Sequence, residues 1–440
     1  TNVLTLATTY TDLAGNAGGA GQTANFEIDT LLPTITSITS DTADGSYNLG
    51  DEINVIATFS EAVSLSGGNF VITLDSGGTV TITSITSSTT ANGTYTVGSG
   101  QTSADLTSSS IELSAGSLSD AAGNAMTDFS PSTNLAAGSA LVIDTTAPTV
   151  SSFTMSDTAL KSGETATVTI VFSEAVANFS SAADVTVVNG SLANMTSGDS
   201  ITWTGVYTPT DNVEDDTNVL TLGTNWTDST GTAYGGATVD TDNFTIDTSD
   251  PSISAIATSA FSWGAYLNAT EDNNNGTVSV TTTGVEDGQT VTITLNEQTY
   301  TNTTTDNATT VTITAVALQN LSEGSVTMTA DVSDAAGNAA SQVTSSAFTY
   351  DKTAPTVSSA AMSDTALKSG DTATLTITFS EAVTAFANAD LTIPNGSLST
   401  MTSSDNITWT GTYTPTADVE DTTNVLTLAT TYTDLAGNAG

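Results

Sequence analysis

Carboxylates dominate the side chains that could carry chemistry in this chain. It has no histidine and no cysteine, and its three basic residues are Lys161, Lys352 and Lys368, so arginine is absent as well. Triads that pair serine or cysteine with histidine are therefore impossible, and zinc would lack its usual nitrogen and sulfur ligands. Paired carboxylates could serve a glycosidase, but an active site should be unique and these carboxylates repeat. We therefore expect no enzyme.

The carboxylates recur in three short phrases. Phe-Ser-Glu-Ala-Val occurs at 59–63, 172–176 and 379–383. Asp-x-Ala-Gly-Asn occurs at 12–16, 120–124, 334–338 and 434–438. Asp-x-x-x-Pro begins at Asp29, Asp144, Asp247 and Asp351, at intervals of 115, 103 and 104 residues. These intervals predict units of about 100 residues, the size of one small β-sandwich.

A longer repeat encloses these units. Residues 1–18, TNVLTLATTYTDLAGNAG, return unchanged at 423–440, one period of 422 residues later. This repetition is typical of a tandem array, and we expect a segment like residues 19–30 to follow residue 440. The predicted domains are the last strands of a truncated domain at 1–29, complete domains at 30–144, 145–247 and 248–351, and a domain at 352–440 that lacks its last strand.

The alternation of apolar residues with threonine predicts the elements that position the acidic phrases. Val168, Ile170 and Phe172 alternate with Thr and Val, and segment 375–379 repeats the pattern. Such a period of two is typical of half-buried strands, whereas helical periodicity is absent. We therefore expect an all-β chain of tandem immunoglobulin-like sandwiches. Trp203 and Trp409, on matching strands, are predicted to lie in the cores.

The ordered recurrence of the three phrases resembles the bacterial immunoglobulin-like repeats that stand in tandem in giant surface adhesins and related extracellular proteins. Segment 248–351 departs from the pattern, because TTTGVEDGQTVTITL replaces the Phe-Ser-Glu-Ala-Val phrase. It is similar to a second subtype from the same proteins. In segment 145–247 the Asn motif has become Asp228-Ser-Thr-Gly-Thr232. The resemblance implies an extracellular or cell-surface protein with calcium at the domain junctions.

The topology of a seven-stranded sandwich brings the three acidic phrases together. The B–C loop, the F–G loop and the incoming linker all lie at the pole that faces the preceding domain. Four metal sites are therefore predicted, with these residues: Asp29, Glu61, Asp120 and Asn124; Asp144, Glu174 and Asp228; Asp247, Glu286, Asp334 and Asn338; Asp351, Glu381, Asp434 and Asn438. Asp250 is a further candidate in the third set.

Calcium is the ion that such oxygen-only sites suit, because Ca²⁺ accepts roughly six to eight oxygens in flexible geometry. Unpaired carboxylates also repel one another, and almost no Lys is available to pair them. The alternative is that Asp-x-Ala-Gly-Asn is only a good turn sequence, with Gly at positive φ and Asp capping the loop. A second acidic cluster, at 211–216 and again at 418–421, is interpreted first as a solvated loop and second as a metal site.

The formal net charge of −44 excludes nucleic acid as a partner and disfavours anionic membranes. No apolar run is long enough for a transmembrane helix, so direct membrane insertion is not expected. The sequence predicts a structural stalk of a large bacterial surface adhesin, stiffened by calcium, in which each repeat contacts its neighbours. The alternative is the repeat unit of a self-assembling filament or surface layer, with lateral or head-to-tail association. A carbohydrate-binding module would need repeated aromatic platforms, which the four Trp residues do not provide.

Overall fold

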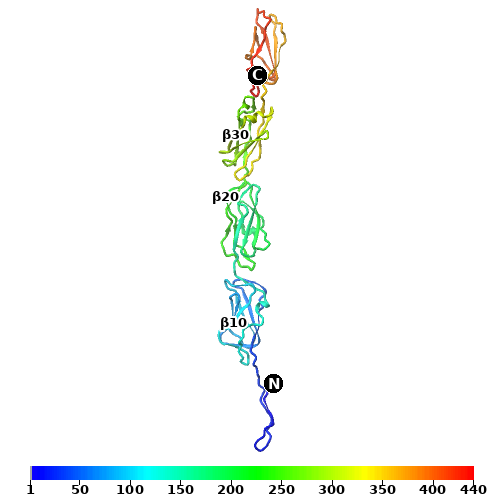
Figure 1. The fold of residues 1–440 in the computed structure, drawn as a ribbon. Coiled ribbons are helices and arrows are strands. Elements are labelled where there is room, and N and C mark those ends of the chain that lie inside the picture. The colour runs from blue at the N-terminus through cyan, green and yellow to red at the C-terminus, as the bar shows by residue number, and fades with distance from the viewer. Residues whose placement is uncertain (1) are drawn as a thin grey trace. The chain divides into compact units, whose positions relative to one another are not determined.

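The computed structural model describes residues 2–440, and nearly all of its regular structure is β (Figure 1). The prediction of an all-β chain of immunoglobulin-like sandwiches is confirmed. The chain divides into two compact units, of which the first holds residues up to 156, 166–207 and 219–243. The second holds residues 157–165, 208–218 and 244–440. The predicted domain boundaries stay a prediction.

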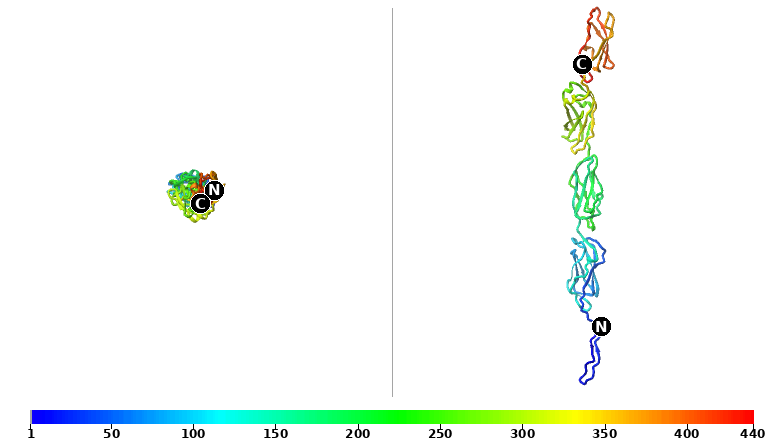
Figure 2. Two further views of the ribbon diagram at one scale, coloured as in Figure 1. Left: turned by 90° about the horizontal axis from the view of Figure 1, so that it is seen from above. Right: turned by 45° about the vertical axis from the view of Figure 1, so that its right-hand side comes forward.

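Residues 2–29 form a two-stranded hairpin, drawn in blue in Figure 2. Strand β1 (Thr5–Leu6) pairs antiparallel with β2 (Gly21–Gln22), and an isolated bridge joins Asn2 to Phe26. Its apolar side chains are not covered, since Leu4 is 67% and Ile28 is 62% exposed.

Residues 30–144 contain three sheets that share one hydrophobic cluster. The long strand β5 (Glu52–Ser66) pairs on one edge with β3 (Ile35–Ser40) and on the other with β8 (Ser88–Thr96). Its alternate residues are buried, as its period of two requires. The other elements are β4 (Gly45–Tyr47), β6 (Phe70–Leu74), β7 (Thr79–Ile82), β9 (Thr102–Ser103), β10 (Ser108–Leu113), β11 (Ser117–Ser119), the 3₁₀ turn η1 (Leu135–Ala137) and β12 (Leu141–Asp144).

Segment 145–247 contributes strands to both units. In the first unit, β13 (Val150–Met155), β15 (Ala166–Phe172), β19 (Thr202–Pro209) and β18 (Gly190–Leu192) form one sheet in that order. The same unit holds β16 (Val176–Ala177), α1 (Ser181–Asp184), β17 (Val185–Thr186), β21 (Thr221–Leu222), β22 (Thr227–Asp228) and β23 (Val239–Asp240). In the second unit, β24 (Phe244–Asp247) lies between β14 (Ala159–Lys161) and β20 (Glu214–Asn218).

Segment 248–351 has its own cluster of buried residues, from Ile253 to Tyr350. Its central strands are β27 (Gly276–Thr283), which pairs with β30 (Ala308–Ile313), and β28 (Thr290–Leu295), which pairs with β29 (Gln298–Thr303). The other elements are β25 (Ser252–Ile253), η2 (Thr258–Ala260), β26 (Tyr266–Leu267), η3 (Glu271–Asn273), α2 (Ala315–Gln319), β31 (Gly324–Val326), β32 (Thr329–Asp331), β33 (Val343–Thr344) and β34 (Phe348–Tyr350).

Segment 352–440 repeats the first sheet of segment 145–247. Strands β35 (Val357–Met362), β36 (Ala373–Phe379), β40 (Thr408–Pro415) and β39 (Gly396–Leu398) follow one another in that order. The remaining elements are β37 (Val383–Thr384), η4 (Asn388–Asp390), β38 (Leu391–Thr392), β41 (Thr427–Leu428) and β42 (Thr433–Asp434).

The tryptophan prediction holds in part, because Trp409 packs against the core cluster of its segment. Trp203 and Trp409 are only half-buried, and each ring packs edge-on against a phenylalanine, Phe179 at 5.0 Å and Phe386 at 5.1 Å. The fully buried tryptophan is Trp226, which the sequence did not single out as core.

Within residues 2–440, no helix has the length and apolarity needed to cross a bilayer.

Candidate metal centres

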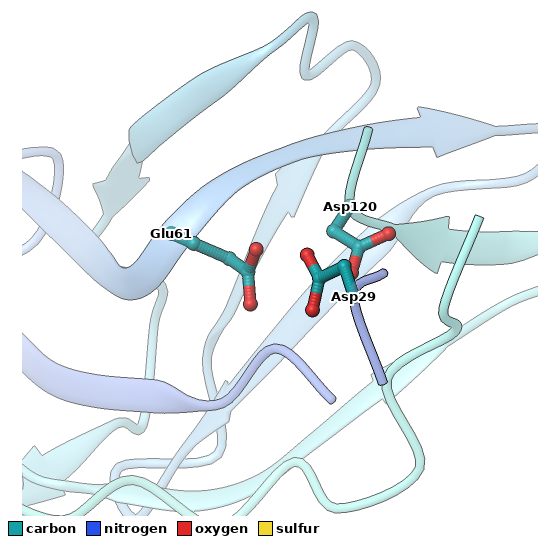
Figure 3. Close-up of side chains that lie close together, drawn as sticks. All are labelled: Asp29, Glu61 and Asp120. Atoms are coloured by element: carbon teal, nitrogen blue, oxygen red, sulfur yellow. The ribbon is translucent and has the colours of Figure 1, made fainter. Parts of the chain in front are cut away.

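Three carboxylates from separate segments meet at the start of segment 30–144. Asp29 comes from the linker, Glu61 from β5 and Asp120 from the loop after β11. Figure 3 shows their oxygens pointing toward one another, and one oxygen of each lies within 4.8 Å of the other two. The structure thus brings together the three carboxylates of the first predicted set.

The Asp-x-Ala-Gly-Asn loop fixes the orientation of Asp120. The backbone N–H of Asn124 donates to Asp120 Oδ1 at 2.8 Å, and the Asn124 side-chain amide donates to Oδ2 at 2.7 Å. Burial raises the pKa of Asp120, but the hydrogen bonds lower it by a larger amount. The pKa of Asp120 therefore lies below its usual value. Asp120 is therefore held ionised and in one rotamer, as a metal ligand or as a loop cap.

The same arrangement occurs twice more. The two further triads are Asp144, Glu174 and Asp228, and Asp351, Glu381 and Asp434, with the same 4.8 Å limit on ligand-atom separation. In each, the linker aspartate also accepts a hydrogen bond from the backbone N–H two residues later. Asp144 Oδ1, for example, accepts from Thr146 N at 2.9 Å. The aspartate of the F–G loop is again the buried member, at 0% exposure for Asp228.

Asp228 differs from its counterparts in one respect. Its Oδ1 accepts hydrogen bonds from Thr230 N, Thr230 Oγ1 and Thr232 N, at 2.7–2.8 Å. No asparagine follows in the motif, and Asp228 Oδ2 is buried without any hydrogen-bond partner. A buried carboxylate oxygen without a donor is costly, so this atom fits a bound cation.

The glutamates of the three triads feel the neighbouring charges. Burial raises the pKa of Glu174, and the carboxylates of Asp144 and Asp228 raise it further. The pKa values of Glu61 and Glu381 are raised for the same reasons. Like charges at this separation disfavour ionisation, and a divalent cation among them would reverse the effect.

The third predicted set is built differently. Asp247, Glu286 and Asp334 do not form a triad of the kind described above, because Glu286 Oε2 accepts the backbone N–H of Ala335 at 2.8 Å. Asp247 is still close enough to them for their charges to raise its pKa, after the larger effect of burial. Segment 248–351 lacks the Phe-Ser-Glu-Ala-Val phrase, which accounts for the different placement of its glutamate.

A cavity of about 230 Å³ lies beside Asp247. Its carboxylate-bearing lining residues are Glu214, Asp247, Asp250 and Glu286. Glu214 belongs to the second acidic cluster, and it lies opposite Asp247 in the pairing of β20 with β24. That cluster was interpreted first as a solvated loop and second as a metal site. The pairing that brings it to Asp247 has no sequence signal beyond the acidic run itself.

The asparagines predicted as ligands are engaged in other contacts. The Asn338 amide donates to Asp334 Oδ2 at 2.9 Å and to the backbone carbonyl of Asp247 at 3.0 Å. Its Oδ1 accepts the backbone N–H of Ser162 at 2.8 Å. Asn438 makes the same bonds to Asp434, Asp351 and Ala269. Asn124 likewise reaches the carbonyl of Asp29 at 3.3 Å.

Sequence reasoning missed the turns that receive these loops. They are 48–51, 161–164 and 268–271, each closed by a bond from its first backbone N–H to the carboxylate of its fourth residue. At the first turn, the Asn48 side chain donates to the carbonyl of Thr230 at 2.7 Å. A signal was present, since each turn has Asn or Lys followed three residues later by Asp or Glu.

Two of these segments match a known protein family. Residues 144–246 and 351–440 match the family described as "Bacterial Ig-like domain". A search of curated proteins found no match.

Three solved structures are similar to the chain. A bacterial ice-binding adhesin is 21% identical, covers 74% of this chain and 100% of its own, and has a TM-score of 0.39. A Ca²⁺-stabilised, ice-binding adhesin of an Antarctic bacterium is 18% identical, with coverage of 91% and 98% and a TM-score of 0.32. The Escherichia coli adhesin FdeC is 12% identical, with coverage of 64% and 99% and a TM-score of 0.25.

Proposed function

We propose that this chain, in which residues 144–246 and 351–440 are bacterial Ig-like domains, is an extender segment of a bacterial surface adhesin. Calcium at the carboxylate triads couples each linker to the sandwich that follows it. The proposal places the chain outside the cell and gives it a mechanical role without catalysis. It is supported by repetition, since residues 1–18 and 423–440 are identical and the Asp-x-x-x-Pro phrase recurs at the start of each segment.

The observation that carries the calcium part is the site of Asp144, Glu174 and Asp228. Three carboxylates converge there, and Asp228 Oδ2 is buried without a partner. Lysine is nearly absent from the chain, so a bound cation is the available counter-charge. Carboxylates and nearby carbonyls are hard oxygen donors, which suit Ca²⁺ in flexible geometry better than Mg²⁺ in near-ideal octahedral geometry.

The residues of these sites have two roles: some would bind the ion, and others position those ligands. The triad carboxylates would hold the ion, while the motif asparagines hold the buried aspartate in place. Because Asn124 and Asn438 also donate to the linker carbonyl, a hydrogen bond would tie the linker to the loop in addition to the ion at these two triads. The ion would supply charge neutralisation and no reaction step. The expected result is a linker with restricted bending when calcium is present.

Isothermal titration of the full chain with Ca²⁺ tests the proposal. We expect about three sites, with affinities near 10⁻⁴–10⁻³ M as in extracellular modules, one for each triad. Asp228→Asn should remove one site, whereas the exposed Asp242→Asn should remove none. Small-angle scattering should show a narrower distribution of dimensions in calcium than in chelator. Absence of binding at millimolar calcium, or identical scattering in both conditions, would contradict the proposal.

A further inference from the structure

We propose that the fifth residue of each F–G loop sets how strongly the neighbouring carboxylate triad binds calcium. These residues are Asn124, Thr232 and Asn438, each four positions after the buried aspartate of its triad. The inference rests on the proposed calcium function and deepens it. Its consequence is that the triad of segment 145–247 binds calcium more tightly than the other two triads.

One oxygen of the buried aspartate is bound in the same way in all three loops. The backbone N–H of the fifth residue donates to Oδ1 of the aspartate, at 2.8 Å in each loop. The three aspartates that accept this bond are all buried: Asp120, Asp228 and Asp434. This contact comes from the backbone, so it does not depend on which side chain the fifth residue carries.

The second oxygen of the aspartate distinguishes the loops. The side-chain amides of Asn124 and Asn438 donate to Oδ2 of their aspartates, both at 2.7 Å. Thr232 has no amide, and its hydroxyl lies 3.2 Å from the carbonyl oxygen of Asp144 instead. Within the described residues, no donor reaches Asp228 Oδ2, which is buried. A single side chain thus decides whether this oxygen has a protein partner.

The unpartnered oxygen increases the gain in free energy when calcium binds. Without an ion, Asp228 Oδ2 is removed from water and makes no hydrogen bond, which destabilises the ion-free state. At Asp120 and Asp434 the amide already supplies a partner, and it competes with a cation for the lone pairs of that oxygen. We therefore expect the Asp228 triad to bind calcium about tenfold more tightly, a factor within the usual cost of an unpartnered buried acceptor.

Asp228 is well positioned even though its loop lacks the asparagine. Its Oδ1 also accepts the backbone N–H and the hydroxyl of Thr230, at 2.8 and 2.7 Å. The third position of the other two loops is alanine, Ala122 and Ala436, which has no hydroxyl to donate. Threonine at this position therefore orients Asp228 through Oδ1 and leaves Oδ2 for the ion, as a group that positions a metal ligand should.

The extender would respond to calcium in steps. As free calcium rises, the triad of Asp144, Glu174 and Asp228 fills first and restricts its linker, and the other two triads follow at higher concentration. The stiffness of the chain would then vary from one junction to the next, because the fifth residue of the loop differs between segments.

Hydrogen exchange in the full chain, followed by peptic digestion and mass spectrometry, measures the three sites separately. Protection of each loop peptide should rise as calcium fills its triad, because the fifth residue bonds the buried aspartate through its N–H. We expect half-maximal protection of loop 228–232 at about tenfold lower free calcium than for loops 120–124 and 434–438. Equal midpoints in the three loops would overturn this inference alone. No calcium response in any loop would overturn the proposed function as well.

Reciprocal substitutions test the fifth residue itself. Thr232→Asn should raise the calcium midpoint of loop 228–232 about tenfold, and Asn124→Thr should lower that of loop 120–124 by a similar factor. The first change has a natural precedent, since the loop of Asn438 already contacts a turn that begins with another asparagine, Asn268. Thr232→Ser keeps the hydroxyl and adds no amide, so this matched control should leave the midpoint unchanged.

Stability in chelator separates this role from a general loss of packing. There the introduced amide of Thr232→Asn should donate to Asp228 Oδ2 and raise the melting temperature of segment 145–247, although the same change weakens calcium binding. Asn124→Thr should lower the melting temperature of segment 30–144 in chelator, because Asp120 Oδ2 loses its donor. If Thr232→Asn lowered both stability and calcium affinity, or changed neither, the inference would be wrong.

Discussion

The side-chain amide of Asn338 lies 3.0 Å from the backbone carbonyl oxygen of Asp247, 91 residues earlier in the chain. The same amide holds Asp334 Oδ2 at 2.9 Å, and Asn338 Oδ1 accepts the backbone N–H of Ser162. One buried side chain thus joins a linker, a loop aspartate and a turn. These contacts need no metal, so this junction contains a hydrogen-bonded clamp in addition to any bound ion.

Replacing Asn338 with alanine should open this clamp. Asn338 is 4% exposed, and the change leaves Asp334 Oδ2 and the Ser162 N–H without their partners. We expect the free energy of unfolding of segment 248–351 to fall by about 1–3 kcal/mol, the usual penalty for buried polar groups left without a hydrogen-bond partner. Hydrogen exchange should also accelerate in the peptide that contains Ser162. Asn16→Ala, in the exposed hairpin motif, is the matched control and should change neither measurement.

Glu174→Gln should have opposite effects with and without calcium. Burial, then Asp144 and Asp228, raise the pKa of Glu174 in the ion-free protein. A raised carboxyl pKa means that stability present at low pH is lost as the pH rises through that pKa. At neutral pH the neutral glutamine removes this repulsion, so the melting temperature in chelator should rise. In calcium it should fall below that of the natural chain, since a ligand is missing.

The same shift predicts a proton linkage for calcium binding. As the pH falls toward the raised pKa of Glu61, Glu174 and Glu381, more of these groups carry a proton that the ion must displace. Calcium titrations near pH 5 in two buffers of different ionisation enthalpy should therefore show proton release, and those near pH 8 should show almost none. An apparent affinity that does not weaken with acidification would argue against carboxylate ligation.

Much of this organisation could be predicted from sequence, for physical reasons that concern particular residues. The strands followed from alternation, because Val168, Ile170 and Phe172 must share one face of β15 and are all buried there. Convergence of Asp144, Glu174 and Asp228 followed from strand direction, which fixes the end of the sandwich that each loop reaches. The metal ligands themselves stay a prediction.

Other features depend on geometry that spacing does not encode. Glu286 was grouped with Asp334 by loop position, but its carboxylate accepts the N–H of Ala335, which depends on local backbone direction. The asparagines were assigned as ligands from their oxygen atoms, whereas the structure uses their amide nitrogens on the linker carbonyls. Trp226 was passed over because it occurs once, although it fills the place between Phe172 and Tyr234.

Glu286 offers a comparison between the two kinds of junction. Because one of its oxygens is committed to Ala335, Glu286→Gln should weaken calcium binding less than Glu174→Gln does. For Glu174→Gln we expect the calcium affinity of one site to fall by at least about tenfold, since even the loss of a residue that only positions a metal ligand usually costs this much. Titration of both variants against the natural chain makes the measurement. Equal losses would mean that the third junction binds an ion through the same arrangement as the triads.

The loop glycines allow backbone strain to be separated from contact with the preceding turn. Gly231 has φ of +96° and Gly123 has φ of +97°, a region that favours glycine. A Cβ at Gly231 would lie 3.1 Å from Asn48 Nδ2, whereas one at Gly123 meets nothing within 4 Å. Both Gly→Ala changes should therefore lower stability by about 1 kcal/mol or more through strain. The Asn48 side-chain amide donates to the Thr230 carbonyl at 2.7 Å. Only Gly231→Ala should also displace Asn48 from this hydrogen bond. Amide NMR signals of the Asn48 side chain would report this displacement, and unchanged signals would show that the turn and the loop do not need this close approach.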